Sequence, residues 1–105
     1  IPNAQTLPES QWISRYGPTI LRKGKILAAS ASVQNLQWSR EDQQISAIVR
    51  DKFQPPAEVE IGLTATQDGW SIDFIDCDCG RIRGCAHSAA VLATVMRGDL
   101  VELSK

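Results

Sequence analysis

All three cysteines of this chain and its only histidine fall within eleven residues of sequence. They stand as Cys77-Asp-Cys79 and Cys85-Ala-His87, with five residues between the two pairs. A structural Zn²⁺ ion takes four tetrahedral ligands from thiolate sulfur and imidazole nitrogen, and three Cys with one His complete that set. We therefore expect one structural zinc ion bound by Cys77, Cys79, Cys85 and His87, which forces the two pairs to meet at one point of the fold.

The spacing suggests how the two pairs meet. Cys77 and Cys79 lie two apart at the end of a predicted strand, where alternate side chains project to the same side. The loop from Gly80 to Gly84 reverses the chain, so that Cys85 and His87 sit at the start of a predicted helix. A disulfide between Cys77 and Cys79 would close a strained ring. A catalytic Cys–His pair would need a free, accessible thiolate, so both alternatives rank well below zinc.

Three thiolates with one divalent cation carry a net charge of −1 that needs compensation. Free N–H groups at the start of the following helix favour thiolate. Arg81 and Arg83, on the loop between the ligand pairs, could add charge-assisted hydrogen bonds. The same two arginines could instead contact phosphate or an acidic partner, and the sequence leaves both roles open.

The N-terminal third predicts short helices. Thr6 and Glu9 have the spacing of a capping box, which predicts a helix that ends near Gly17 and Pro18. A second helical turn is expected to start at Thr19 and to close at Gly24 in the left-handed conformation. Trp12, Trp38 and Trp70 could stack on nucleic-acid bases, but in a small domain such residues belong more often to the core.

The middle of the chain predicts an antiparallel sheet of about four strands. Four segments are β-branched or alternate between apolar and polar residues, and turn-forming residues separate them. The predicted strands are Ile26 to Val33, Ile45 to Asp51, Val59 to Ala65 and Trp70 to Ile75. Asp68-Gly69 is a strong hairpin signal between the last two. Alternation predicts two sets of core-facing side chains. These sets are Val59, Ile61 and Leu63, and Trp70, Ile72 and Phe74.

The last predicted element is a helix from about Ala86 to Arg97, capped by Gly98. Its few polar residues define no wide polar face, so it is either packed deeply here or covered by a neighbouring part of a larger protein. We thus expect residues 1–105 to form a single α+β domain, in which the sheet packs with short N-terminal helices and a C-terminal helix.

Charge limits the possible partners. Eleven Lys and Arg against twelve Asp and Glu give a net charge of −1, so any binding to nucleic acid must be local. Asp73, Asp76 and Asp78 beside the ligands are interpreted as solvent-facing strand residues. No apolar stretch is long enough to cross a bilayer, and no leader resembling a signal peptide opens the chain. A cytoplasmic protein is expected, with association to the bacterial nucleoid as one possibility, and no small-molecule substrate.

The run Cys77-Asp-Cys79, then Cys85-Ala-His87 followed by Ser-Ala-Ala-Val-Leu, resembles the SWIM zinc finger. Upstream, the stretch Ile20-Leu-Arg-Lys-Gly-Lys-Ile-Leu resembles the region before this finger in bacterial proteins that continue into a Swi/Snf-type helicase-like ATPase. The resemblance implies the same four zinc ligands and an accessory module for DNA or protein contacts, beside an ATPase domain of the same chain. This chain is less basic around the finger than members proposed to bind DNA.

These observations predict a binding module rather than an enzyme, excised from or belonging to a longer protein. No phosphate-binding Gly-rich loop followed by Lys and Ser or Thr occurs, so these residues should hydrolyse no ATP. Contact with DNA through Arg81 and Arg83 is one expectation. The alternative is a protein–protein or intramolecular docking domain that binds no nucleic acid.

Overall fold

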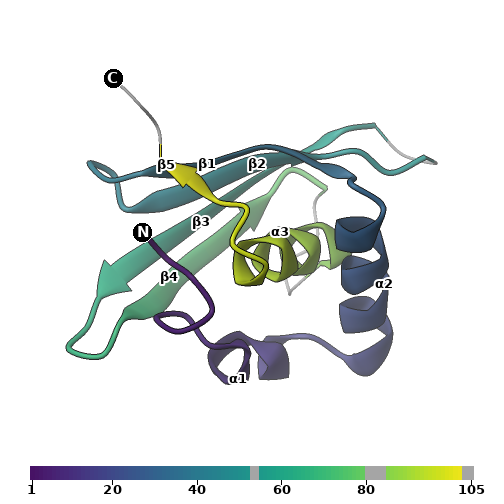
Figure 1. The fold of residues 1–105 in the computed structure, drawn as a ribbon. Coiled ribbons are helices and arrows are strands. Elements are labelled where there is room, and N and C mark those ends of the chain that lie inside the picture. The colour runs from purple at the N-terminus through teal and green to yellow at the C-terminus, as the bar shows by residue number, and fades with distance from the viewer. Residues whose placement is uncertain (53–54, 80–84, 103–105) are drawn as a thin grey trace.

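The computed structural model describes residues 1–52, 55–79 and 85–102. Its helices lie in the first and last thirds of the chain, and the strands lie between them and after the last helix (Figure 1). The elements are α1 (Glu9–Trp12), a 3₁₀ turn η1 (Ile13–Arg15), α2 (Pro18–Ala29), β1 (Val33–Ser39), β2 (Gln44–Val49), β3 (Ala57–Ala65), β4 (Trp70–Cys77), α3 (Ala86–Met96) and β5 (Val101–Glu102). The expected α+β class is confirmed.

The sheet has five described strands in the order β4-β3-β2-β1-β5. β1 to β4 form an antiparallel ladder. β2, β3 and β4 match three predicted strands, but β1 lies almost wholly after the segment Ile26 to Val33 that was expected to supply the first strand. β5 pairs in parallel with β1 at one edge, and the sequence analysis did not include it. β5 has only two residues, which is too short for a periodic pattern to be detected in the sequence. It is recognised as a strand only because the chain after α3 pairs with β1.

α3 is the central helix of the structure. It lies against the inner face of the sheet, and α2 crosses it from the other side (Figure 1). Nine of its eleven residues are buried, Ala89, Leu92 and Val95 completely. Its lack of a polar face is therefore explained by packing within this chain, since α2 and the sheet together cover it.

The region around Gly24 differs most from the sequence prediction. Gly24 does not end a helix, because α2 continues unbroken through it to Ala29, so the strand predicted from Ile26 is wrong. The chain leaves the helix at Ala31, whose φ is 58°, and β1 begins at Val33. Glycine is needed at this position because α2 and α3 approach each other closely there. A Cβ on residue 24 would stand 2.5 Å from the Cβ of Ala89 in α3.

The predicted capping box is also wrong. The N-cap of α1 is Pro8, which makes no side-chain cap hydrogen bond. The Thr6 hydroxyl accepts a hydrogen bond from the backbone N–H of Asn3 instead, at 3.1 Å. The Asn3 carboxamide oxygen accepts from the N–H groups of Gln5 and Thr6, which closes an Asx turn. The polar side chain that organises this entry is therefore Asn3.

One residue in the fourth strand shifts the alternation of side chains. Leu63 pairs with Ile72 but Gly62 pairs with Phe74, so Asp73 is an extra residue that forms a β-bulge. Trp70 and Ile72 face the core as expected, whereas Phe74 points to the other face and is 43% exposed. The prediction of a core position for Phe74 is wrong, because a bulge reverses the phase of every residue beyond it.

The other expectations for the sheet and the last helix hold. Val59, Ile61 and Leu63 are buried side by side on the inner face. The turn at Asp68-Gly69 joins β3 to β4, and Gly98, with a φ of 83°, follows α3 as its left-handed cap. Among the described residues, no helix has the length and apolar character required to span a bilayer.

Candidate metal centre

The structure brings Cys77, Cys79, Cys85 and His87 together where β4 ends and α3 begins. One candidate ligand atom from each residue lies within 4.8 Å of all the others. All three cysteines are free thiols, so no disulfide competes for them. Four soft donors from two separate elements therefore surround a single point.

The bulge in β4 decides on which side of the sheet this point lies. If side chains alternated strictly from Trp70 to Cys77, with no bulge at Asp73, Cys77 would share the outer face with Ser71. With it, Cys77 lies opposite Val59 and in phase with Ile75, on the face that packs against α3. The sequence alone placed the two cysteines on one side of a strand. The bulge is what turns the Cys77 thiol toward the helix that carries the other two ligands.

Cys79 is held by a turn rather than by the strand. β4 ends at Cys77, and Asp78 bonds back to Glu58 at the start of β3. The Asp78 backbone N–H donates to the Glu58 carbonyl at 3.2 Å, and the Asp78 carboxylate accepts from the Glu58 N–H at 3.0 Å. This reciprocal pair fixes the chain between the two cysteines, and it leaves Cys79 as the exposed member of the set.

Cys85 is the N-cap of α3, and its environment favours the thiolate. Its sulfur accepts a hydrogen bond from the backbone N–H of Ser88 at 3.4 Å, the arrangement expected of a capping side chain. Burial acts to raise the pKa of Cys85, but the hydrogen bond from the Ser88 backbone N–H, together with contacts of the sulfur with the Ser88 side chain and the neighbouring thiols, holds it below its usual value. The anticipated stabilisation of thiolate by the helix start is thus present at this residue.

Cys77 responds in the opposite direction. Burial raises the pKa of the Cys77 thiol above its usual value, and the charge of the nearby Cys85 adds to the effect. Of these two residues, Cys85 therefore forms the thiolate more readily. A cation at the centre would lower the pKa of both thiols, because it offsets burial and the mutual repulsion of the sulfurs.

The geometry fits a tetrahedral zinc site. The Cys77 sulfur lies 3.7 Å from Nδ1 of His87, which identifies Nδ1 as the nitrogen facing the thiols. In a tetrahedron with a Zn–S bond of about 2.3 Å and a Zn–N bond of about 2.05 Å, the S···N edge is about 3.6 Å. These two atoms are thus already separated as two ligands of one ion would be, and all four candidate ligand atoms lie within 4.8 Å of one another.

Behind Cys85 lies a buried polar contact that sequence reasoning missed. The Tyr16 hydroxyl lies 2.9 Å from the hydroxyl of Ser88, which itself bonds to the carbonyl of Cys85 at 3.0 Å. Because the Ser88 proton goes to that carbonyl, Tyr16 donates to Ser88. Ser88 lies three residues after the N-cap, where a capping box carries Glu or Gln, so no capping signal in the sequence marks it. Nothing in the sequence connects Tyr16 to a site 72 positions away.

The remaining candidate residues divide into three groups. Arg81 and Arg83 lie outside the described residues, so their two possible roles stay predictions. Asp73, Asp76 and Asp78 are exposed on or just after β4, as expected of solvent-facing residues. The tryptophans belong to the core rather than to a base-stacking surface. Trp12 and Trp38 are buried, and Trp70 packs edge-to-face on Trp38 at 5.0 Å.

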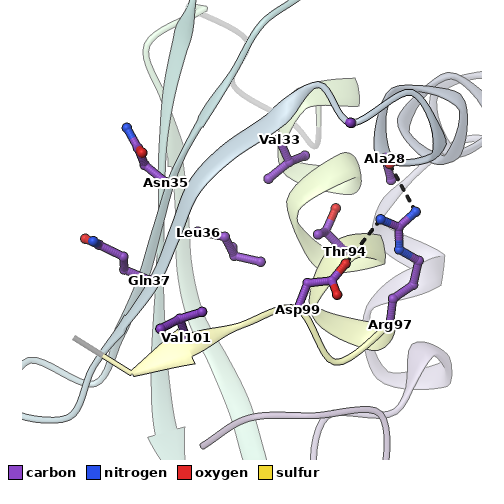
Figure 2. A pocket seen from close by; sticks show the side chains of 10 residues that line it. Ala28, Val33, Asn35, Leu36, Gln37, Thr94, Arg97, Asp99 and Val101 are labelled. Carbon is purple, nitrogen blue, oxygen red and sulfur yellow. Dashed lines mark hydrogen bonds and ion pairs between the residues drawn. The ribbon is translucent and has the colours of Figure 1, made fainter. Parts of the chain in front are cut away.

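A hollow of about 500 Å³ lies between the end of α2, β1 and β5 (Figure 2). Figure 2 shows Leu36 pointing into it and Asn35 pointing away. The charged side chains at its rim are paired, since Arg97 bonds to Asp99 at 3.1 Å and to the carbonyl of Ala28 at 3.1 Å. These bonds tie the end of α3 to the end of α2, and we assign the hollow no chemistry.

The chain was compared with known protein families, with curated proteins and with solved structures, and none of the three comparisons finds a match. Any assignment of function therefore stands on the residues and geometry of this chain. The part that the structure carries is a group of three cysteines and one histidine that could hold a metal ion.

Proposed function

We propose that this chain is a binding module held together by one structural zinc ion, and that it contacts DNA or another protein through the end of the fold where the ion lies. The observation that carries this proposal is the convergence of Cys77, Cys79, Cys85 and His87 within 4.8 Å. Three thiolates and an imidazole form a closed set that favours Zn²⁺ over hard cations and leaves no position for water. The role proposed is therefore structural, and the chain itself is no enzyme.

The position of the site supports a folding role. The ion would join the end of β4 to the start of α3, the helix around which the core is built. These elements are linked by residues 80–84, so the metal would close a short loop and fix the approach of α3 to the sheet. Free energy of ligation then contributes directly to the free energy of unfolding.

Contact with nucleic acid is proposed at the same end. The backbone of Gly24 lies against the first turn of α3, and the same helix α2 carries Arg22, Lys23 and Lys25. These three side chains are exposed, and Lys23 and Lys25 form surface ion pairs with Asp51 and Glu9. Arg81 and Arg83 belong to the connecting segment in sequence, so positive charge would collect around the site. A local basic patch is what phosphate contacts require in a chain of nearly zero net charge.

The resemblance to the SWIM zinc finger supports the same reading. It leads us to propose that the module accompanies a Swi/Snf-type helicase-like ATPase domain in a longer chain. Three free thiols in one cluster suit a reducing compartment, and we propose the cytoplasm. The test of this context is the reading frame beyond Lys105, which should encode a Gly-rich phosphate-binding loop.

Metal content decides the first half of the proposal. Protein purified under reducing conditions should contain one equivalent of zinc by elemental analysis, and Cys79→Ser should lower that content. Ser71→Cys is a matched control, because it adds a thiol on the outer face of β4 away from the ligands. Clearly substoichiometric metal in fresh protein would refute the zinc site.

Binding to duplex DNA decides the second half. Metal-loaded protein should bind with an affinity that falls as salt rises, and Arg81→Ala with Arg83→Ala should weaken binding. The control removes two cations elsewhere, with Arg15→Ala and Lys52→Ala, both exposed in the structure. Equal loss in both double variants would indicate only bulk charge. Absence of binding at low salt would leave a protein-docking module, the alternative proposal, which is favoured by the acidic face described next.

A further inference from the structure

The helices described here pack on one face of the sheet, so the other face of β3 and β4 faces solvent (Figure 1). Glu58 and Glu60 project from β3 on that face, and Asp73 and Asp76 from β4. All four are exposed. Together with Phe74 they form what we call the acidic face. Neither strand contains a lysine, arginine or histidine, although the whole chain is almost neutral.

Phe74 is a large apolar group in the middle of these charges. It is 43% exposed, and its ring lies over Gly62 on the neighbouring strand. There is no room for a Cβ at Gly62 beneath the ring. The ring therefore covers Gly62, and the exposed part of its surface is open to a partner.

The charges on this face are not arranged for stability. Glu60 lies directly opposite Asp76 across the β3–β4 ladder, and like charges in that position destabilise a sheet. Among the described residues, none forms an ion pair with Glu58, Glu60, Asp73 or Asp76. The Thr64 hydroxyl donates to the Asp73 carboxylate, but no positive charge within residues 1–52, 55–79 and 85–102 offsets the four acids. A local choice that opposes folding in this way indicates a surface kept for binding.

The sign of the charge selects the partner. Nucleic acid is repelled by four carboxylates. A second copy could offer α2, where Ile26 is 60% exposed, but Lys23 and Lys25 of that helix already pair with Asp51 and Glu9. Such a contact would also join unlike surfaces and need not close into a defined oligomer. A separate cationic segment meets neither objection.

We propose that the acidic face docks a Lys/Arg-rich segment of a protein partner, with one aliphatic side chain of that segment seated on Phe74. The four carboxylates supply complementary charge and orientation, and the exposed side of the ring supplies apolar contact at the centre. This inference rests on the proposed function, and it specifies the kind of protein that the module would contact. It uses no residue of the metal centre.

The probe is a short synthetic Lys/Arg peptide with a central leucine, added to zinc-loaded ¹⁵N-labelled protein. We expect amide shifts to concentrate on β3 and β4, and binding to weaken as salt rises. Replacing the leucine of the peptide by serine should weaken binding, as should Phe74→Ser in the protein. Glu60→Gln with Asp76→Asn should lower affinity about tenfold, because two exposed ion pairs are lost.

Stability separates this result from simple unfolding. The Glu60→Gln/Asp76→Asn variant removes a like-charge pair, so its melting temperature should equal or exceed that of the parent while its binding falls. The matched control is Glu41→Gln with Asp68→Asn, which removes two acids in the hairpin turns and should bind as the parent does. Zinc content should be unchanged in every variant, so failure here leaves the metal proposal intact.

Several outcomes would overturn the proposal. They are shifts centred on α2 or the metal centre, equal affinity in the two double variants, binding of duplex DNA on β3 and β4, and self-association that Ile26→Ser abolishes. The last would identify a second copy of the chain as the occupant. No shift at low salt would also refute it, because complementary charge should then act most strongly.

Discussion

Replacing Gly24 with alanine tests the contact that sets the distance between α2 and α3. The added Cβ would stand 2.5 Å from the Cβ of Ala89 and 3.1 Å from the carbonyl oxygen of Ala86. Ordinary carbon–carbon contact needs about 3.5–4.0 Å, so the helices must separate by roughly 1 Å at their crossing. Neither neighbouring atom can rotate away, because one is a Cβ and the other is backbone.

Two effects of opposite sign decide the result. Alanine in a helix interior is favoured over glycine by about 1 kcal/mol. Overpacking a close-packed interior costs about 1–3 kcal/mol, and contact with atoms that cannot move favours the upper end. We therefore expect Gly24→Ala to lower the free energy of unfolding by about 2 kcal/mol. In a domain of this size this corresponds to a fall in melting temperature of roughly 10 °C.

Chemical denaturation of the zinc-loaded protein, in a double-mutant cycle with Ala89→Gly, is the assay. Ala89→Gly alone loses helix propensity, but in the double variant it vacates the space that the new methyl group needs. The double variant should return close to the parent, with a coupling energy of about 2–3 kcal/mol. Arg22→Ala against Arg22→Gly, at an exposed position of α2, measures the propensity difference without the contact.

The outcome separates two interpretations of the same glycine. If Gly24 ended a helix in the left-handed conformation, alanine would be destabilising for a backbone reason that Ala89→Gly could not correct. A neutral or stabilising Gly24→Ala, or a double variant no better than the single one, would refute the packing argument. Because Ala86 adjoins the ligands Cys85 and His87, we also expect Gly24→Ala to weaken zinc affinity.

Three further predictions concern the metal centre and its support. A strong chelator should lower the melting temperature of the parent sharply, because ligation of the metal contributes to folding. It should lower the melting temperature of Cys79→Ser much less, and equal shifts in the two proteins would contradict this. Lowering the pH should release the ion as thiolates and imidazole take up protons, with dye-detected zinc appearing as the unfolding transition moves down in temperature. Burial raises the pKa of Tyr16 from 10.0 to about 12. The unfolded state therefore loses the tyrosine proton first, and the free energy of unfolding should fall by about 2–3 kcal/mol as the pH rises from about 10 toward 12. Tyr16→Phe should cost about 1 kcal/mol at neutral pH through the lost bond to Ser88, and should flatten that alkaline decline; an unchanged slope would show that another group is responsible.

Much of this fold follows from local sequence. The helix α3 and its cap at Gly98, the hairpin at Asp68-Gly69 and the inner face of β3 are all encoded by residues close together in the chain. The metal cluster belongs to the same group, because its four donors lie within eleven positions and their chemistry restricts them to one kind of site.

The errors arise where a distant neighbour overrides local preference. Gly24 is a natural helix terminator by itself, but packing against Ala89 makes it the closest point of a continuous helix. Strict alternation assigns Phe74 to the core, but the bulge at Asp73 moves it to the outer face. Neither the helix crossing nor the bulge can be detected from the hydrophobic periodicity of the sequence. Each depends on how two elements that are separated in sequence pack against each other.

By itself, then, the sequence determined the class of fold and the identity of the candidate ligands, since periodicity and donor chemistry act over short range. The tertiary structure decided how the site is assembled. The bulge turns Cys77 toward α3, and Tyr16 from the N-terminal third supports the turn that holds Cys85. The charge of the outer face was likewise visible only once β3 and β4 were paired in register, because Glu60 and Asp76 become neighbours through hydrogen bonding between strands.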